Sequence, residues 1–467
     1  MVGKIRITLL TGALVCLSAF AEMQPNILFI SVDDLRPELG CYGQDYMITP
    51  NIDRLADEGV LFEKAFCNYP VCGASRASLM TGLRPTPERF NIYYSRADED
   101  APGIPDIAVT LKAAGYRTIS NGKIYHHKDD NEASWDEIFR PKEFCQYFTE
   151  ENLSILKTAK SLNGKSVKGL PYEAADEPDE SYQGAKVAAK AIEELKRAKE
   201  SGKPVFITAG FTKPHLPFNC PQKYWDMYPA ETIAMPDNFF VPTNAPAEAI
   251  HDFNELRGYY GVPESGPLPE AMALNLIRGY RACTTFSDAM IGRVFQTLDD
   301  LEMWDDTIVI LWGDHGWQLG EHTLWCKHAN FNTSLQTPLI VRAPGTSNKN
   351  TSALVEFVDL YPTICDLAGL KKPAHLDGTS FVPLLADPSM DWKKAVFGRY
   401  QKGDSIRTSR YLYTEWRNKE GETVASMLYD HKVDPDENNN VAGHPEYKDV
   451  VKRLSHELKA GWPHLQN

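Results

Sequence analysis

The sequence has little cysteine, a deficit of positive charge and no long hydrophobic run. Nine cysteines in 467 residues are too few for a fold held together mainly by disulfides. Lys and Arg total 49 against 63 Asp and Glu, so the net charge is −14, which argues against a nucleic-acid-binding protein with a basic surface. This balance does not exclude an anionic substrate, because a local group of cations or a metal ion can outweigh it. Hydrophobic residues at 43% and charged residues at 24% are typical of globular proteins and exclude a disordered, fibrous or multi-span membrane chain.

Residues 1–21 have the composition of a signal peptide. Lys4 and Arg6 precede an apolar run from Ile7 to Phe20, and the segment ends in an A-x-A cleavage pattern at Ala21. The run is shorter than the ~20 residues that cross a bilayer as a helix; an uncleaved N-terminal anchor is the alternative. We therefore expect an exported protein without a membrane span, periplasmic or secreted if its source is bacterial.

Four short apolar segments predict buried strands, and polar residues follow each of them. Their continuous apolar character suits parallel strands that helices cover on both faces. The predicted strands are Asn26–Val32, Tyr116–Ser120, Pro204–Thr208 and Thr307–Trp312. The predicted helices are Ile52–Gly59, Ala108–Ala114, Tyr182–Lys199 and Leu276–Leu298. This alternation predicts an α/β domain over residues 22–390, with a large, mostly parallel sheet flanked by helices.

The C-terminal part, residues 391–467, has a different pattern. Short aromatic-rich segments separated by turn residues predict antiparallel strands, and Val450–Ala460 predicts a closing helix. The strands are expected at Ala395–Tyr400, Ser405–Thr408 and Tyr411–Trp416. We expect a small α+β subdomain here. Loops are predicted over Ala97–Asp106, Glu173–Glu180 and Asp434–Asn440.

Acidic residues follow two of the predicted strands. Asp33 and Asp34 come after the first, and Asp314 and His315 come after the fourth. Because ligands bind beyond the carboxyl ends of the strands in such sheets, we expect these side chains to meet at one edge. Three carboxylates and an imidazole suit Ca²⁺ or Mg²⁺ better than a structural zinc ion. The alternative is that Asp33 and Asp34 are solvated caps.

Cations follow the other strands. The set comprises Lys123, His126, Lys213, His215 and Lys327. Lysines beside a divalent metal would hold a tetrahedral anion, and histidines there would act as general acid or base. Taken singly, each residue is equally a surface lysine or a hydrogen-bonded core histidine, so the hypothesis depends on the whole set.

Cys72 lies in the most specific segment of the chain. Small residues surround it and precede a helix predicted over Ser75–Met80, which places Cys72 at or near a helix N-terminus. The helix dipole there favours an anion and a lowered thiol pKa, as in a thiolate nucleophile. A buried, inert cysteine is the alternative.

The segment resembles the type I sulfatase motif C-x-P/A-S-R, followed by T-G. Cys72, Ala74, Ser75 and Arg76 match the first part, and Thr81-Gly82 matches the second. Further blocks in the family's order are Pro25–Asp34, Thr49–Ala56, Gly122–His126, Lys213–His215, Asp288–Arg293, Asp314–Gly316 and Leu428–Asn440. Within this family, Asp314–His322 and Lys213–Phe218 are most similar to iduronate-2-sulfatases. The resemblance covers essentially the whole chain after the signal peptide and implies an alkaline-phosphatase-like fold.

The resemblance implies a sulfatase acting on a sulfated oligosaccharide or polysaccharide, with 2-O-sulfated uronic acid as the expected target. In the family, a maturation enzyme oxidises the motif cysteine to Cα-formylglycine, whose hydrate attacks sulfur. By this resemblance Cys72 would be modified. Together with the four metal-ligand candidates it would bind one Ca²⁺ ion, in the set Asp33, Asp34, Cys72, Asp314 and His315.

The remaining family roles fall on six residues of this chain. Arg76 would orient the formylglycine, while Lys123 and Lys327 would hold the sulfate oxygens. His215 would protonate the leaving oxygen, and His126 would assist regeneration of the aldehyde. Trp317 would line the sugar pocket.

Two positions depart from the common family pattern. Ala74 stands where many sulfatases have proline, which leaves the identity of the formylglycine-generating enzyme open. His315 replaces the asparagine of many arylsulfatases and favours the iduronate-like branch. Two other functions stay open at this point, a phosphate or phosphonate ester hydrolase of the same superfold and a non-catalytic carbohydrate-binding homologue.

Overall fold

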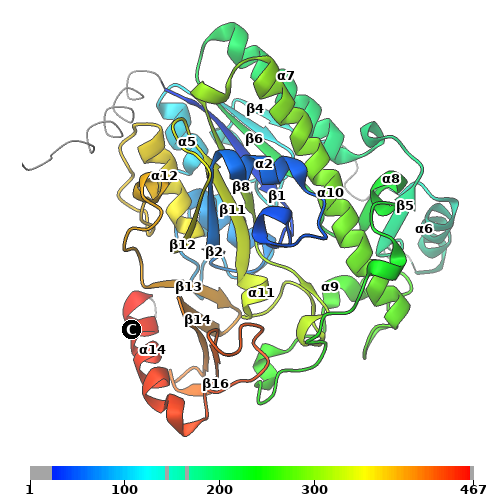
Figure 1. The fold of residues 1–467 in the computed structure, drawn as a ribbon, viewed down its shortest axis with the longest axis vertical. Helices are drawn as coiled ribbons and strands as arrows, with labels where there is room; N and C mark the ends of the chain where they lie inside the picture. Colours follow the sequence, from blue (N-terminus) through cyan, green and yellow to red (C-terminus); the bar gives the residue numbers. More distant parts are fainter. Residues whose placement is uncertain (1–23, 142–146, 164–167, 463–467) are drawn as a thin grey trace, which may run out of the picture.

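A mixed eight-stranded sheet forms the centre of the residues that the structure describes. The computed structural model describes residues 24–141, 147–163 and 168–462, and the side chains of these residues except 159–163. The predicted signal peptide, residues 1–21, lies outside the described residues. The strand order is β12-β2-β11-β8-β1-β6-β3-β4 (Figure 1).

The predicted strands form the middle of this sheet. β1 (Asn26–Val32) pairs in parallel with β6 (Val205–Phe211) on one side and with β8 (Thr307–Gly313) on the other. β3 (Arg117–Asn121) continues the parallel pairing next to β6. The remaining strands of the sheet are β2 (Val60–Phe66), β4 (Glu137–Phe139), β11 (Gln336–Arg342) and β12 (Lys349–Glu356). Since β11 runs antiparallel to both of its neighbours, the sheet is mostly parallel, as predicted.

Helices cover both faces of the sheet. The core beneath one face contains residues of α2 (Pro50–Glu58), α7 (Gln183–Ser201) and α10 (Glu270–Asp300). The core of the other face contains residues of α3 (Cys72–Thr81), α5 (Ile107–Ala113) and α12 (Leu360–Leu367). Figure 1 shows α7 and α10 side by side across the sheet. Alternate residues of β1 enter the two cores, which is why this strand is apolar at almost every position.

Two of the family-like sequence blocks bind each other inside this framework. The Asp288 carboxylate on α10 accepts the Asn51 and Ile52 backbone N–H groups at 3.0 and 2.8 Å. These N–H groups belong to the first turn of α2 and have no partner within that helix. A Cβ at Gly292 would lie 2.3 Å from Asn51 Oδ1, so glycine permits the close approach of α10. The Asp288 block is therefore structural.

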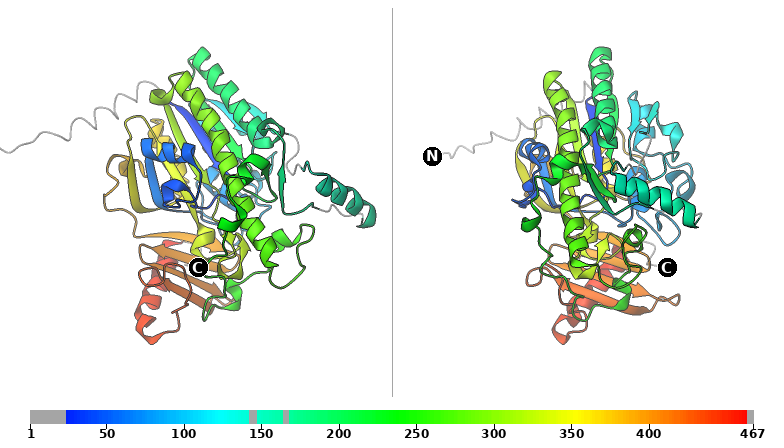
Figure 2. Two further views of the ribbon diagram at one scale, coloured as in Figure 1. Left: turned by 45° about the vertical axis from the view of Figure 1, so that its right-hand side comes forward. Right: turned by 90° about the vertical axis from the view of Figure 1, so that its right-hand side faces the viewer.

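A four-stranded antiparallel sheet follows the main sheet in the chain. Its strands are β13 (Ala395–Tyr400), β14 (Gly403–Thr408), β15 (Tyr411–Arg417) and β16 (Thr423–Asp430). The helix α14 (Lys448–Gly461) packs on it and shares its apolar core. Figure 2 shows this unit at one end of the molecule, in orange and red. The predicted C-terminal strands and helix are thus confirmed, and β16 is an addition.

The sequence-based prediction is wrong in two loops. The segment Glu173–Glu180 overlaps β5 (Tyr172–Ala175), which pairs with β7 (Phe218–Pro221) in a separate two-stranded sheet. A short helix, α4 (Ala97–Asp100), begins the segment Ala97–Asp106. Four-residue strands and helices are too short to show a hydrophobic period. The remaining α-helices and strands are α6 (Glu150–Asn163), α8 (Gln222–Trp225), α9 (Asn254–Arg257), β9 (Gln318–Leu319), β10 (Trp325–Cys326), α11 (Asn332–Leu335) and α13 (Val382–Ala386).

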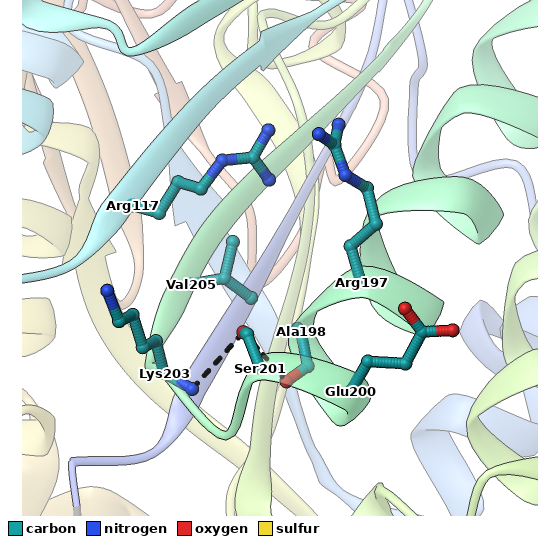
Figure 3. A pocket seen from close by; sticks show the side chains of 7 residues that line it. All are labelled: Arg117, Arg197, Ala198, Glu200, Ser201, Lys203 and Val205. Atoms are coloured by element: carbon teal, nitrogen blue, oxygen red, sulfur yellow. Dashed lines mark hydrogen bonds between the residues drawn. The ribbon is translucent and has the colours of Figure 1, made fainter.

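A surface pocket of about 420 Å³ lies where β3 and β6 begin, at the opposite strand ends from the polar clusters. Figure 3 shows its lining side chains, which include Arg117, Arg197 and Lys203. The two arginines already pair with the Glu194 carboxylate, so they serve the packing of α7. Within the described ranges, no helix has the length and apolar character needed to cross a membrane.

Candidate active site

The ends of β1 and β8 bring the acidic residues together. Because the two strands are neighbours and parallel, Asp34 and Asp314 meet at one edge of the sheet, and both are fully buried. The Asp34 N–H donates to Asp314 Oδ1 at 2.9 Å, and the Tyr280 hydroxyl donates to the Asp34 carbonyl at 2.8 Å. These bonds hold Asp34 at a φ of 62°, an uncommon backbone conformation for a residue other than glycine.

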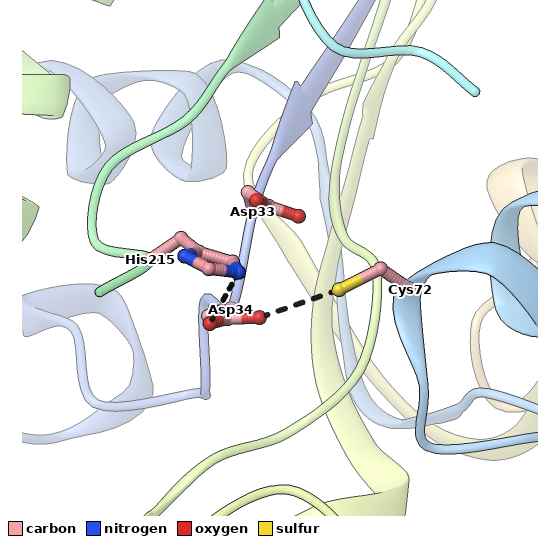
Figure 4. A group of neighbouring side chains, drawn as sticks. All are labelled: Asp33, Asp34, Cys72 and His215. Atoms are coloured by element: carbon pink, nitrogen blue, oxygen red, sulfur yellow. Dashed lines mark hydrogen bonds and ion pairs between the residues drawn. The ribbon is translucent and has the colours of Figure 1, made fainter. Parts of the chain in front are cut away.

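Cys72 is the first residue of α3 and faces this acidic edge. Its Sγ lies 3.2 Å from His315 Nε2. Figure 4 shows its contact with Asp34, whose Oδ1 lies 3.8 Å from Sγ. The predicted place at a helix N-terminus is confirmed. Burial raises the thiol pKa to about 11, against the lowering effects of Lys123 and Lys327. The unmodified thiol is therefore protonated at neutral pH, and the hypothesis of a helix-stabilised thiolate is wrong.

Arg76 lies one turn further along α3 and forms ion pairs with two of the carboxylates. Its Nη2 pairs with Asp33 Oδ1 and its Nε with Asp314 Oδ2, each at 2.9 Å. Nη1 donates to Ser31 Oγ and to two backbone carbonyls at 2.7–3.0 Å. All three guanidinium nitrogens are thus used within a fully buried site. Arg76 positions the acidic edge.

The converging donors fit a hard divalent cation. Ligand atoms of Asp34, Cys72, Asp314 and His315 lie within 4.8 Å of one another, and Asp33 belongs to an overlapping group. The His315 Nδ1–H donates to the Gly316 carbonyl at 2.9 Å, which leaves the Nε2 lone pair facing Asp34. A second hydrogen bond of this kind is how proteins orient a metal-binding histidine. Carboxylate oxygens with one imidazole are a donor set suited to Ca²⁺.

Two lysines complete the pocket on the side of these carboxylates. Lys123 Nζ lies 2.5 Å from Asp33 Oδ2, and Lys327 Nζ lies 3.1 Å from Asp34 Oδ1. Burial lowers the pKa of Lys327, but the neighbouring acidic groups, of which Asp34 contributes most, together outweigh burial and hold this pKa well above its usual value. Both ammonium groups are therefore charged at the centre of the site, as the sequence predicts for anion binding.

His215 lies between two carboxylates. Its Nε2 is 3.8 Å from Asp34 Oδ2 and 3.2 Å from Glu255 Oε1, while its Nδ1–H donates to the Leu216 carbonyl. Burial lowers the pKa of His215, but the neighbouring carboxylates, of which Asp34 contributes most, together outweigh burial and raise the pKa to about 10. The imidazole thus carries a proton at neutral pH that it can donate.

Glu255 is the residue that the sequence analysis missed. It belongs to the short helix α9, and its side chain is 18% exposed. Its Oε2 lies 2.9 Å from Lys327 Nζ, so it contacts both Lys327 and His215. A carboxylate in a four-residue helix, far from any predicted strand, carries no local signal that would have identified it.

His126 differs from His215 in charge. Burial, followed by the charge of Lys123, lowers its pKa to about 3, so the ring is neutral. Its Nδ1 is buried without a hydrogen-bond partner among the described residues. The role of His126 in regenerating the aldehyde stays a prediction.

Lys213 and Trp317 do not line the pocket as expected. Lys213 Nζ donates to the Pro217 carbonyl at 2.5 Å and to the His215 carbonyl at 3.2 Å, so it fixes the loop that carries His215. The Trp317 side chain is 1% exposed and lies under Lys327, with Nζ 5.0 Å from the ring centroid. Trp317 therefore supports Lys327 by a cation–π contact, and the expected direct contact with the sugar is wrong.

Comparison with known families agrees with this geometry. The family model described as "Sulfatase" matches residues 25–370, a range that holds every residue of the site. The chain belongs to the sulfatase family. A second model, "N-sulphoglucosamine sulphohydrolase, C-terminal", matches residues 320–462 and thus includes both Lys327 and the antiparallel sheet.

This sulfatase is similar to proteins of known name. It is 34% identical to the iduronate 2-sulfatase of Mus musculus over 76% of this chain and 71% of the relative. Its identity to the iduronate 2-sulfatase of Homo sapiens is 32%, over 79% of this chain and 74% of the relative. A solved structure of a protein bound to D-glucosamine-2-N,6-O-disulfate superposes with a TM-score of 0.76 at 22% identity, covering 95% and 98% of the two chains. The protein is therefore an enzyme that hydrolyses sulfate esters, and the non-catalytic alternative is set aside.

Proposed function

We propose that this sulfatase removes the 2-O-sulfate from a uronic acid in a sulfated oligosaccharide or polysaccharide fragment. The observation that carries the proposal is the placement of Cys72 Sγ, 3.2 Å from His315 Nε2 and close enough to Lys123 and Lys327 for both ammonium charges to act on it. The similarity to two iduronate 2-sulfatases supports the choice of sugar.

The nucleophile requires a modification of Cys72. A buried thiol with a raised pKa is a poor nucleophile at neutral pH, so we assign Cys72 as the substrate of a formylglycine-generating enzyme. Once oxidised, the residue supplies an oxygen nucleophile in place of sulfur. Its position at the first turn of α3, beside Asp34 and His315, supports this assignment.

The metal ligands we propose are Asp33, Asp34, residue 72, Asp314 and His315, around one Ca²⁺ ion. When bound, the ion polarises the sulfate and favours the ionised form of the nucleophile. Arg76 keeps Asp33 and Asp314 in place through its two ion pairs. The paired arginine also offsets part of the negative charge that these carboxylates bring together.

The remaining side chains divide the work between binding and proton transfer. Lys123 and Lys327 hold the sulfate oxygens and balance their charge. His215, which carries a proton, donates it from Nε2 to the leaving sugar oxygen. His126, which is neutral, accepts a proton when the second half of the reaction restores the resting enzyme.

The organisation of the chain follows the same proposal. Residues 1–21 would direct export and be removed, residues 22–390 would form the catalytic domain, and residues 391–467 would form the C-terminal subdomain. Export to the periplasm or the cell exterior would place the enzyme where sulfated polysaccharides occur.

Sulfate release from defined sugars tests the function. Uronic acid 2-sulfate, glucosamine 6-sulfate and glucosamine N-sulfate, each as monosaccharide and disaccharide, are incubated with the matured enzyme, with a phosphate and a phosphonate monoester for comparison. We expect the uronic acid 2-sulfates to give the highest kcat/KM. Cys72→Ala removes turnover. Cys365→Ala, which changes a buried cysteine on a different helix, α12, retains turnover. Preferred hydrolysis of another position or of the phosphorus esters would refute the assignment.

A further inference from the structure

An exposed aromatic surface lies next to the active site and takes no part in the chemistry described above. It consists of Tyr93, Tyr94 and His127, and we call it the aromatic rim. Tyr93 is 50% exposed and Tyr94 is 58% exposed. Their ring centroids are 3.8 Å apart, and Tyr94 stacks on His127 at 6.4 Å with an angle of 9° between the rings. Contiguous exposed aromatic side chains of this kind mark interaction sites.

The aromatic rim is continuous with the catalytic pocket. A Cβ at Gly73, the residue after Cys72, would lie 2.1 Å from the Tyr93 carbonyl oxygen. The backbone of Tyr93 therefore packs directly on the first turn of α3. The His126 ring also meets Tyr93 edge to face, with centroids 6.3 Å apart and an angle of 81°. The aromatic rings thus run without a break from the pocket to the surface.

Hydrogen bonds at both ends hold the aromatic rim in place. The Tyr69 hydroxyl donates to the Asn91 carbonyl at 2.5 Å, and Arg96 pairs with Asp129 at 3.0 Å. The His127 Nε2–H donates to the Tyr94 carbonyl at 3.2 Å. A ligand that binds here meets rings that are already positioned, which lowers the entropic cost of binding.

We propose that the aromatic rim is a subsite for the sugar that adjoins the sulfated uronic acid in an oligosaccharide substrate. This inference rests on the proposed function. One face of a pyranose ring presents C–H groups that pack on an aromatic ring, while its hydroxyls reach the tyrosine O–H groups at the edge. Tyrosine suits this contact because it offers a large, rigid, amphipathic surface.

The charge and size of the aromatic rim favour a sugar over other occupants. The neighbouring arginine, Arg96, is already held by Asp98 and Asp129, so the surface is not arranged to bind a second sulfate. Three rings are also too few for a protein partner, because a specific interface buries about 1,000 Å² or more. The aromatic rim also adjoins His126 directly, through the edge-to-face contact of Tyr93.

Chain-length dependence of catalysis tests the subsite. The matured enzyme and its Tyr93→Ala and Tyr94→Ala variants are compared on a uronic acid 2-sulfate monosaccharide and on a tetrasaccharide that carries the same sulfated unit. We expect wild-type kcat/KM to be about tenfold higher for the tetrasaccharide, and each variant to lose about that factor on the tetrasaccharide alone. Tyr94→Phe, which retains the ring, keeps most of the preference. Tyr46→Ala is the control, because Tyr46 is another exposed tyrosine and hydrogen-bonds Glu38. We expect it to leave kcat/KM unchanged for both substrates.

Two results would overturn the subsite. One is a wild-type enzyme with equal kcat/KM for both lengths, and the other is a pair of tyrosine variants that lose activity equally on both, which would mean that the rings only support α3. Failure of the proposed function is a different result, since no uronic acid 2-sulfate of either length would then be hydrolysed. In that case the same comparison of lengths, made with the sulfated sugar that the enzyme does hydrolyse, decides the subsite.

Discussion

At the scale of single residues, Glu255 contacts both the proposed general acid, His215, and the proposed sulfate-binding residue Lys327. Its carboxylate lies 3.2 Å from His215 Nε2 and 2.9 Å from Lys327 Nζ. A carboxylate in this place orients the imidazole and keeps the lysine directed into the pocket. We regard Glu255 as a positioning residue, since the described contacts of its carboxylate are with His215, Lys327 and, at 4.0 Å, His328.

The dependence on the leaving group separates positioning from structural support. His215→Ala should lower kcat by about 10²–10⁴-fold for a sugar sulfate, whose alkoxide leaving group needs a proton. Glu255→Gln should lower kcat for the same substrate by a smaller factor, of about ten. Both variants should affect an aryl sulfate much less, because a phenolate leaves without a proton. Steady-state kinetics on the two substrate types measures this, with Glu248→Gln in the same loop as control.

An equal loss on both substrates would contradict the role of Glu255, because damage to the pocket as a whole does not depend on the leaving group. An unchanged kcat of His215→Ala on the sugar sulfate would contradict the assignment of the general acid.

The sequence predicted most individual site residues but not all of them. Asp33, Asp314 and His315 were predicted because each directly follows an apolar strand, and strand ends meet in a parallel sheet. Glu255 could not be predicted in this way, since its position depends on how a long connection folds over the pocket. The burial of Trp317 was missed for the same reason: a residue's exposure after a strand depends on what packs over it.

At the scale of elements, one buried carboxylate on α7 links this helix to β3 of the main sheet. Glu194 is fully buried and pairs with Lys190 and Arg197 on its own helix and with Arg117 on β3. Burial raises the pKa of Glu194, but the three cations outweigh burial and lower it to about 2, from an ordinary value of 4.5. A carboxylate with a lowered pKa stabilises the fold above its unfolded pKa, and this stabilisation is lost as the pH falls towards the folded pKa.

Glu194→Gln should therefore destabilise the protein in a pH-dependent way. We expect a loss of about 2 kcal/mol at pH 7, a loss that shrinks progressively between about pH 4.5 and pH 2. Thermal unfolding of the variant and the wild type across this range gives the difference. Glu193→Gln, at the neighbouring exposed position, should stay within about 0.5 kcal/mol of the wild type. A difference that does not change with pH would show that the charge of Glu194 is not the cause.

The buried strands and the longer helices could be predicted because their pattern of apolar residues is strong. The four predicted apolar strands and four predicted helices of the main domain all exist. Their limits lie within three residues of the prediction, except that α10 begins six residues earlier than predicted. The strands β2, β4, β11 and β12 were missed, although they lie in the same sheet. β11 runs antiparallel between β2 and β8, and this reversal of direction leaves no mark in the local sequence.

At the scale of the whole molecule, the C-terminal sheet supports the active site. Asn330, three residues after Lys327, donates to the Gly403 carbonyl at 3.1 Å and to Ser405 Oγ at 3.0 Å on β14. The chain then returns to the main domain at Trp462, whose indole N–H donates to the Pro85 carbonyl at 3.1 Å. The Trp462 ring also meets Phe397 at 6.0 Å. The two sheets are therefore expected to unfold together.

Removing the Trp462 side chain tests this coupling. Trp462→Ala should cost about 3–5 kcal/mol of stability, because a fully buried indole leaves a large cavity, and it should lower the midpoint of a single unfolding transition. Trp462→Phe, which keeps most of the packing and loses the N–H, should lower the free energy of unfolding by less. Scanning calorimetry with activity measured on the same samples reports both. Two separate transitions, with sulfatase activity surviving the first, would show that the main domain folds independently of the C-terminal sheet.

The proposed nucleophile is oxidised Cys72, and not its thiol. The most direct measurement is the fraction of formylglycine at residue 72, determined by peptide mass spectrometry in preparations made with different amounts of a formylglycine-generating enzyme, together with the sulfatase activity of each preparation. We predict activity that rises in proportion to this fraction and vanishes with it. Full activity in a preparation that contains only unmodified thiol would contradict the account.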